Sequence, residues 1–190
     1  MARKLAATIV VLAAFVALLS ISVLALFTST ASVPGNTFST GTVSLTTSPT
    51  TALVTFSGMA PGDQVTAPIT VTNAGTLQLR YAVTSTTTEN VLAAALDLTI
   101  KSGVTTCTNG GFGTDGTVVY AAADLGSTTG VDVIGNPAQG SQAGDRTLNA
   151  SANEVLCFNV SLPSSTGNSA QGLSTTATFA FQAEQTSSNP

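Results

Sequence analysis

The sequence predicts an all-β fold, a jelly-roll-like β-sandwich with one short helix, preceded by an N-terminal apolar leader. Three observations lead to this prediction. Only 7% of residues are charged, so the polar surface is built largely from Thr, Ser, Asn and Gln; apolar residues alternate along short segments; and turn residues separate these segments. Thr and Val suit such strands because branching at Cβ packs well on a pleated sheet. A chain of 190 residues is long enough for one domain of ordinary size.

The chain begins with the leader. Two basic residues precede an apolar run from Leu5 to Phe27. A charged start followed by an apolar run is typical of an export signal. Small residues allow cleavage after Ala25 or after Ala31, so we predict a signal peptide over residues 1–25, with residue 31 as the alternative end. The run is also long enough to span a bilayer, so a retained membrane anchor is the alternative.

The predicted sandwich occupies residues 37–186, and a polar tail follows at 187–190. Its first strand is predicted over Thr37–Thr46, with Gly41 marking a bulge that restores the inward face. A second short strand is predicted over Ala52–Phe56.

The next two strands show the clearest period-two pattern of the first half. Val65–Val71 alternates apolar and polar residues, and Pro68 places this strand at a sheet edge or at a bulge because proline cannot donate to the ladder. A turn at Asn73–Thr76 is predicted to join it in a hairpin to the following strand. The residues of that following strand predicted on one face are Leu77, Leu79, Tyr81 and Val83.

A short helix and several later strands complete the predicted body. Thr86 and Glu89 have the spacing of a capping box, and Asn90–Leu96 is rich in Ala and Leu, so a short helix is predicted there. Apart from two strand pieces, Gly103–Ala143 is predicted to be loop. The remaining predicted strand segments are Leu96–Ile100, Val118–Tyr120, Val131–Ile134, Val155–Leu162 and Thr175–Ala183.

Two cysteines, Cys107 in the Gly-rich loop and Cys157 in a late strand, are predicted to form a disulfide because the chain is exported. Closing a loop of about fifty residues would stabilise the fold by roughly 4 kcal/mol in the chain-entropy model. The bridge would hold the loop across the outer face of that strand. Two free thiols are the alternative.

The composition excludes several kinds of chemistry. Without His, the chain can form neither an imidazole zinc site nor a Ser-His-Asp triad, and we expect a protein that is not an enzyme and has no cofactor. Because two of the five basic residues lie in the leader, the body carries three basic and nine acidic residues, a net charge of −6 that argues against nucleic acid as a partner. Loop acids are expected to be solvated carboxylates, with a weak calcium site as the alternative. These acids are Asp115, Asp124, Asp132 and Asp145.

Four blocks of the sequence carry a family resemblance. They are NTFSTGTVSL (Asn36–Leu45), MAPGD (Met59–Asp63), NAGTLQLRYAV (Asn73–Val83) and LPSSTGNSAQGLSTTATFAFQAEQT (Leu162–Thr186). Together with the leader they resemble the TasA/camelysin family of secreted biofilm-matrix fibre proteins, which is related to archaeal bundling pilins. The blocks cover most of the body, although Gly103–Gly144 has no clear counterpart.

The resemblance implies a jelly-roll domain whose mature N-terminal segment completes the sheet of the next subunit. It favours cleavage after Ala25, because mature chains of the family begin near an aromatic residue such as Phe27, and leaves residues 26–36 as the donor segment. Burying the apolar side chains of this segment would contribute about 3 to 6 kcal/mol. A disordered N-terminal tail is the alternative. The implied donor-strand residues are Leu26, Phe27, Thr28, Ser29, Thr30, Ala31, Ser32 and Val33.

The leading functional expectation is therefore a secreted, structural subunit of an extracellular fibre or pilus, in a biofilm matrix or at the cell surface. Its partners would be further copies of itself, a signal peptidase during export and neighbouring fibres, since low charge opposes bundling little. One alternative is a monomeric cell-surface sandwich that binds a ligand or sugar. Another is a camelysin-like secreted peptidase, from which the chain departs by lacking the H-E-x-x-H motif.

Overall fold

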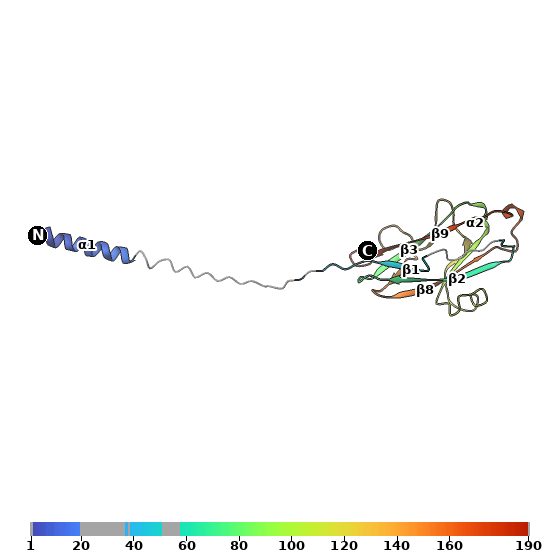
Figure 1. The fold of residues 1–190 in the computed structure, drawn as a ribbon, viewed down its shortest axis with the longest axis horizontal. Helices are drawn as coiled ribbons and strands as arrows, with labels where there is room; N and C mark the ends of the chain where they lie inside the picture. Colours follow the sequence, from blue (N-terminus) through green and yellow to red (C-terminus); the bar gives the residue numbers. More distant parts are fainter. Residues whose placement is uncertain (1, 20–36, 38, 51–57, 190) are drawn as a thin grey trace. The chain divides into compact units, whose positions relative to one another are not determined.

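A computed structural model describes residues 2–19, 37, 39–50 and 58–189. The chain divides into two units, Met1–Ser39 and Thr40–Pro190. The first contains helix α1 (Ala2–Leu19) and the second contains the β-body (Figure 1). None of the helices in the described part of the chain is long and apolar enough to cross a membrane. The predicted cleavage positions, after Ala25 and after Ala31, lie outside the described residues.

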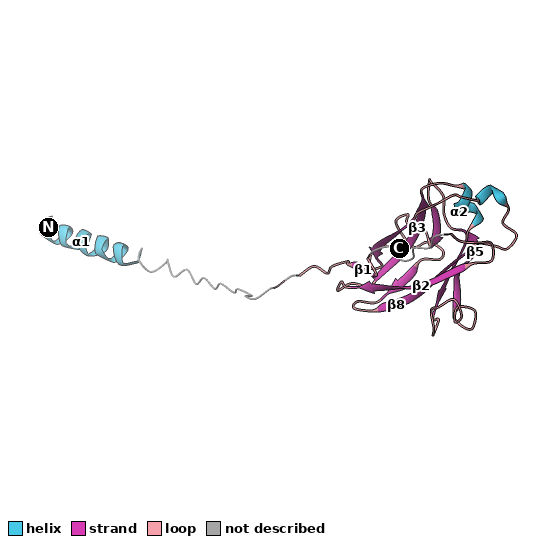
Figure 2. Cartoon of the chain, turned by 45° about the vertical axis from the view of Figure 1, so that its right-hand side comes forward, coloured by secondary structure: helices cyan, strands magenta, loops and turns pink. Residues whose placement is uncertain are grey.

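The β-body consists of two antiparallel sheets, which confirms the predicted all-β sandwich (Figure 2). The first sheet contains, in spatial order, β1 (Leu45–Ser48), β2 (Gln64–Asn73), β8 (Asn153–Ser161), β4 (Asp97–Ser102) and β5 (Thr117–Asp124). The second contains β3 (Leu79–Thr87), β6 (Val131–Ile134), β7 (Arg146–Leu148) and β9 (Ala177–Gln185). In the second sheet β9 pairs along the whole of β3, so β6 and β7 share the other edge of β3.

The core lies between the two sheets, where alternate residues of each strand point inward. Phe179 of β9 packs edge-on against Phe158 of β8 with ring centroids 5.0 Å apart, so aromatic rings connect the two sheets. Most of the apolar side chains predicted to share one face of β2, β3, β4 or β8 belong to this core. Burial of apolar area is the main driving force for packing such faces together. The inward residues that are no more than 1% exposed include Val71, Leu79, Tyr81, Val83, Leu98, Ile100, Leu156 and Phe158.

The short helix α2 (Val91–Ala95) is present, but the predicted capping box is wrong. Thr86 lies inside β3, four residues before the N-cap position, so its hydroxyl does not cap the helix. The carboxylate of Glu89 instead accepts hydrogen bonds from the backbone N–H groups of Val91 and Leu92, at 2.7 and 2.9 Å, and of the next residue. Glu89 thereby satisfies N–H groups that have no partner within the helix.

The predicted hairpin between β2 and β3 is also wrong, because the two strands lie in different sheets. The buried side-chain amide of Asn73 donates to the carbonyl oxygens of Leu77 and Leu148, and its own oxygen accepts the N–H of Gly75. These bonds hold a corner at which the chain passes from one sheet to the other. A Cβ added to Gly75 would lie 2.3 Å from the carbonyl oxygen of Thr42, so only glycine fits at this corner.

Two other strand predictions differ from the structure. The first strand begins at Leu45, whereas Thr37–Thr46 was the predicted range, and Gly41 precedes it instead of forming a bulge within it. The reason is that the backbone before β1 lies over the corner and accepts hydrogen bonds from Ala74 and Thr76 instead of joining a ladder. The predicted strand Ala52–Phe56 lies outside the described residues.

The later strands follow the prediction more closely. β5 extends beyond the predicted Val118–Tyr120, and β7 was not predicted because three residues around Arg146 show no readable alternation. Pro68 lies in β2 opposite Cys157, with unbroken register. Since β1 pairs only with Thr70–Asn73, the other side of Pro68 is a strand edge within the described part of the chain, as predicted.

Candidate assembly surface

The outer strands of the two sheets provide the surfaces at which another chain could pair. In the described part of the chain, β1 and β5 of the first sheet and β6, β7 and β9 of the second each pair on one side only. An outer strand presents unpaired N–H and C=O groups, which are a template for adding a further strand. These edges differ in length and regularity.

Four of these five strands carry features that discourage further pairing. β1, β6 and β7 contain only four, four and three residues. β5 contains eight residues, but its register with β4 shifts twice, and irregular register twists an edge away from a flat partner. β9 is nine residues long, keeps one register with β3 over all nine pairs, and contains no Pro, Gly or Lys. It is the longest regular edge that the described residues present.

The core is less completely covered beside β9 than at the centre of the second sheet. Phe179 and Phe181 face the core but remain half-buried. Their partners in β3, Ser85 and Val83, have no exposed surface. The ring of Phe181 lies 6.1 Å from that of Tyr81, measured between centroids. The apolar layer therefore continues as far as the edge strand and ends there with aromatic surface in contact with solvent.

The predicted donor residues, Leu26–Val33, lie outside the described residues. Their pairing with another copy stays a prediction. What the structure contributes is the set of edges to which such a segment could add.

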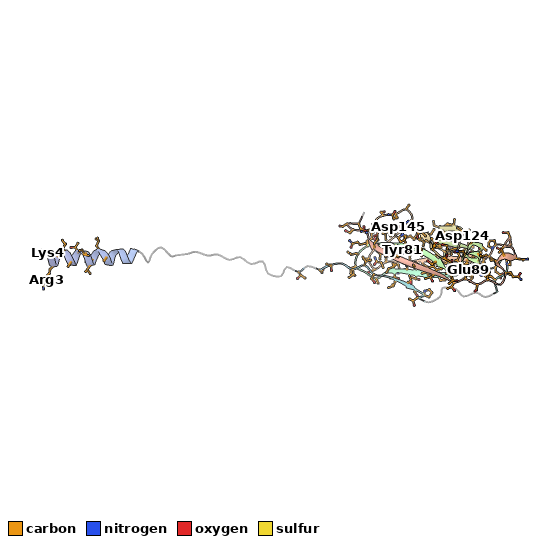
Figure 3. All side chains as sticks on the ribbon, turned by 90° about the horizontal axis from the view of Figure 1, so that it is seen from above. Arg3, Lys4, Tyr81, Glu89, Asp124 and Asp145 are labelled. Carbon is orange, nitrogen blue, oxygen red and sulfur yellow. A yellow bond between two sulfur atoms is a disulfide. The ribbon has the colours of Figure 1, made fainter. Side chains whose placement is uncertain are left out.

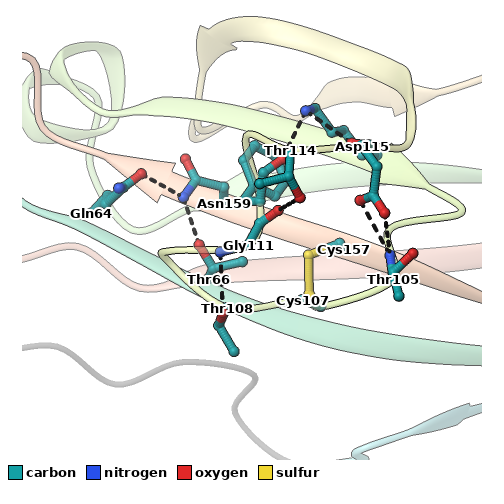
Figure 4. The surroundings of a disulfide bond; sticks show 12 residues. Gln64, Thr66, Thr105, Cys107, Thr108, Gly111, Thr114, Asp115, Cys157 and Asn159 are labelled. Atoms are coloured by element: carbon teal, nitrogen blue, oxygen red, sulfur yellow. Dashed lines mark hydrogen bonds between the residues drawn. A yellow bond between two sulfur atoms is a disulfide. The ribbon is translucent and has the colours of Figure 1, made fainter.

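The disulfide joins Cys107 to Cys157 of β8, with 5.6 Å between the Cα atoms (Figure 4). Cys157 is 1% exposed and lies on the face of β8 opposite the inward Phe158. The bridge attaches the Gly-rich loop between β4 and β5 to the outer face of the first sheet. Nζ of Lys101 donates to the carbonyl oxygen of Phe112 at 2.8 Å and lies 4.7 Å from the centre of its ring, which anchors the same loop a second time.

Two of the four loop acids have a structural role in addition to the predicted contact with solvent. Both oxygens of Asp115 accept the backbone N–H of Thr105, and hydrogen bonds from Thr105 lower the pKa of Asp115 below its usual value. Asp145 accepts the N–H groups of Asn136 and Gln142 at 3.0 and 2.9 Å. These carboxylates hold loops in shape by satisfying backbone donors.

The other two acids lie in strands. Asp132 of β6 accepts the hydroxyl of Thr84, and the exposed Asp124 of β5 lies opposite Asp97 of β4. Figure 3 shows Asp145 towards one end of the body and Glu89 towards the other, so the acids are dispersed. Within residues 2–19, 37, 39–50 and 58–189, no group of three or more His, Cys, Asp or Glu side chains could hold a metal ion.

An ion pair and a hydrogen bond connect the two sheets. Glu154 of β8 accepts two hydrogen bonds from Nε of Arg146 in β7, at 2.9 and 3.0 Å, and one at 2.7 Å from the hydroxyl of Tyr81 in β3. Burial, followed by this hydrogen bond, raises the pKa of Tyr81. The cluster therefore links the first sheet, through Glu154 of β8, to the second sheet, through Tyr81 of β3 and Arg146 of β7.

A pocket of about 160 Å³ lies on the second sheet, between β3, β9 and the loop after β6. Its charged groups already have partners: Nε of Arg80 lies 2.6 Å from Oε1 of Glu184, which also accepts the N–H of Gly140, and Asp145 accepts two backbone N–H groups. The hydrogen bond from Arg80 lowers the pKa of Glu184 below its usual value. With its charges satisfied internally, this pocket offers little to a ligand.

A family model described as "Camelysin metallo-endopeptidase" matches residues 1–190. No curated protein matches the chain.

Proposed function

The chain belongs to the camelysin family, and on that premise we propose that it is a secreted structural protein, a subunit of an extracellular fibre or pilus in a biofilm matrix. The single observation that carries this proposal is the long regular edge of β9, with half-buried aromatic side chains beside it. The sequence blocks that resemble biofilm-matrix fibre proteins support the same function.

The proposed mode of assembly is donor-strand complementation. After export and cleavage, the segment Leu26–Val33 of one copy would add as a strand to an exposed sheet edge of the next copy. Main-chain hydrogen bonds would supply affinity, and alternate side chains would supply specificity. Such head-to-tail contacts between identical subunits propagate into a filament when they do not close into a ring.

Low charge favours association between neighbouring fibres. The body carries three basic and nine acidic residues, and only 7% of the residues of the whole chain are charged. Repulsion between such surfaces is weak and is screened within about 10 Å at ordinary ionic strength. Lateral bundling is therefore part of the proposal.

Negative-stain electron microscopy tests the function directly. The exported chain is compared with a variant that lacks Leu26–Asn36, and circular dichroism verifies that both fold. Fibres from the intact chain and folded, soluble particles from the variant are expected. Fibres from both proteins, or particles from both over a range of pH and salt, would contradict the proposal.

The family description implies a metal ion, but the residues of this chain do not fit one. The sequence contains no His, and both cysteines are consumed in the disulfide. Most of the acidic side chains accept backbone N–H groups or pair with arginine, as described above. We therefore propose that the protein is not a metallopeptidase. Peptide hydrolysis that EDTA abolishes and added Zn²⁺ restores would contradict this conclusion.

A further inference from the structure

We propose that the outer edge of β9 is the acceptor for Leu26–Val33 of a second copy. This inference rests on the proposed function and adds to it the location of the acceptor. It follows from the direction of the backbone groups of β9, from the side chains beside them and from the features of the other edges.

The hydrogen bonds that flank β9 establish which of its backbone groups face outward. The N–H of Thr88 donates to the carbonyl oxygen of Thr176 at 3.1 Å, and the N–H of Thr186 donates to that of Gln78 at 3.2 Å. In an antiparallel pair, hydrogen-bonded residues alternate along the strand. Even-numbered residues of β9 therefore point their N–H and C=O groups towards β3. The residues whose N–H and C=O groups point away from β3 are Ala177, Phe179, Phe181, Ala183 and Gln185.

The inward side chains of the same strand make this edge suitable for an apolar partner. Ala177, Phe179, Phe181 and Ala183 belong to the core but are only partly buried. A strand added beside them would extend the inner layer and cover the exposed part of both phenylalanine rings. The outward side chains of β9, such as Thr178 and Gln182, are exposed and polar or small.

The donor segment has the matching pattern. Its eight residues carry no charge, and in an extended strand one face carries Phe27, Ser29, Ala31 and Val33, three of which are apolar. The opposite face carries Leu26, Thr28, Thr30 and Ser32, so three of its four side chains are polar, like Thr178 and Gln182 on the exposed side of β9. Eight residues are enough to cover most of the nine-residue edge. A second copy of this segment therefore fits the edge in length, polarity and alternation.

Charge does not oppose pairing at this edge. The one charged residue of β9, Glu184, is paired with Arg80. The edge of β5 instead presents Asp124 opposite Asp97, and β5 is irregularly paired with β4. Like charges directly opposite one another on neighbouring strands are destabilising. The pairing of β5 with β4 is therefore weakened at this position, and β5 is a poorer template than β9 for a further strand.

Hydrogen–deuterium exchange of the exported chain tests the acceptor without a mutation. Amide exchange is measured for monomer and for fibres, with β5 as the internal control. The amides of the outward set, Phe179, Phe181 and Ala183, are expected to exchange at least about tenfold more slowly in fibres, while those of Thr117–Asp124 change less. Protection of β5 in place of β9, or protection of these β9 amides already in the monomer, would overturn the inference.

A variant gives a second test. Ala183→Pro removes one outward N–H and leaves the hydrogen bonds to β3 in place, and Ala122→Pro on the exposed edge strand β5 is the matched control. Ala183→Pro is expected to abolish fibres and Ala122→Pro to retain them, with folding verified by circular dichroism. If Ala183→Pro fails to fold, the exchange experiment decides.

The two proposals fail in different ways. If the Leu26–Asn36 deletion abolishes fibres but Ala183→Pro forms them, donor-strand assembly stands and the β9 acceptor is wrong. If the deletion variant still forms fibres, the donor function itself is wrong.

Discussion

Removal of the disulfide is expected to lower the free energy of unfolding of the body by about 4 kcal/mol. The bridge connects residues that are 50 positions apart in the sequence. In the chain-entropy model, closing a loop of that size removes about 14 cal/mol/K from the unfolded state, or about 4 kcal/mol at 25 °C. Cys107→Ala is the suitable substitution because Cys107 is the less buried partner and Cys157 remains in its place beneath the loop.

Urea denaturation of the monomeric, exported chain, monitored by circular dichroism, measures this loss. For a body of this size, 4 kcal/mol corresponds to a fall in Tm of about 8–16 °C. A reducing agent supplies the control: it should lower the stability of the unsubstituted protein to that of Cys107→Ala, and it should leave Cys107→Ala unchanged.

A loss below about 1 kcal/mol would refute the reasoning. It would mean that the unfolded chain retains structure that already limits the separation of Cys107 and Cys157. The bridge would then remove little entropy from the unfolded state.

Three further predictions concern polar groups. Asn73→Ala leaves buried carbonyl oxygens of the corner without a donor and is expected to cost about 2–4 kcal/mol in urea denaturation, whereas an unchanged midpoint would show that the corner holds without it. Glu89→Gln should cost about 1 kcal/mol and Thr86→Ala less than about 0.5 kcal/mol, and the opposite order would restore the capping box. The pKa values of Asp115 and Glu184 are lowered in the folded state by hydrogen bonds from Thr105 and Arg80, so their stabilising contribution is present above the usual carboxylate pKa and is lost as pH falls through the lower, folded values. Tm should therefore be level from about pH 7 to 5 and fall below about pH 4, and a Tm that rises on acidification would contradict this assignment.

The sequence alone was sufficient to predict the sandwich and most of its strands. Burial of one face imposes a period of two, and this period is visible in Val65–Val71 and in Val155–Leu162 without knowledge of their partners. The short helix was predicted in part from an Ala- and Leu-rich run. The disulfide was predicted because the chain carries an export signal and has two cysteines. These are properties of local pattern and composition, which the order of residues expresses directly.

The tertiary structure alone decided which strands are neighbours and where the edges lie. The hairpin between β2 and β3 fails because Asn73 binds the carbonyl of Leu148, 75 residues away, and this bond exists only in the folded body. The side chain of Glu89, and not that of Thr86, accepts the first N–H groups of the helix, because Thr86 lies in the ladder between β3 and β9. The exposed edge of β9 arises in the same way. Its nine-residue register joins segments about a hundred residues apart, and contacts at that separation depend on the whole chain and leave no periodic signal in the sequence.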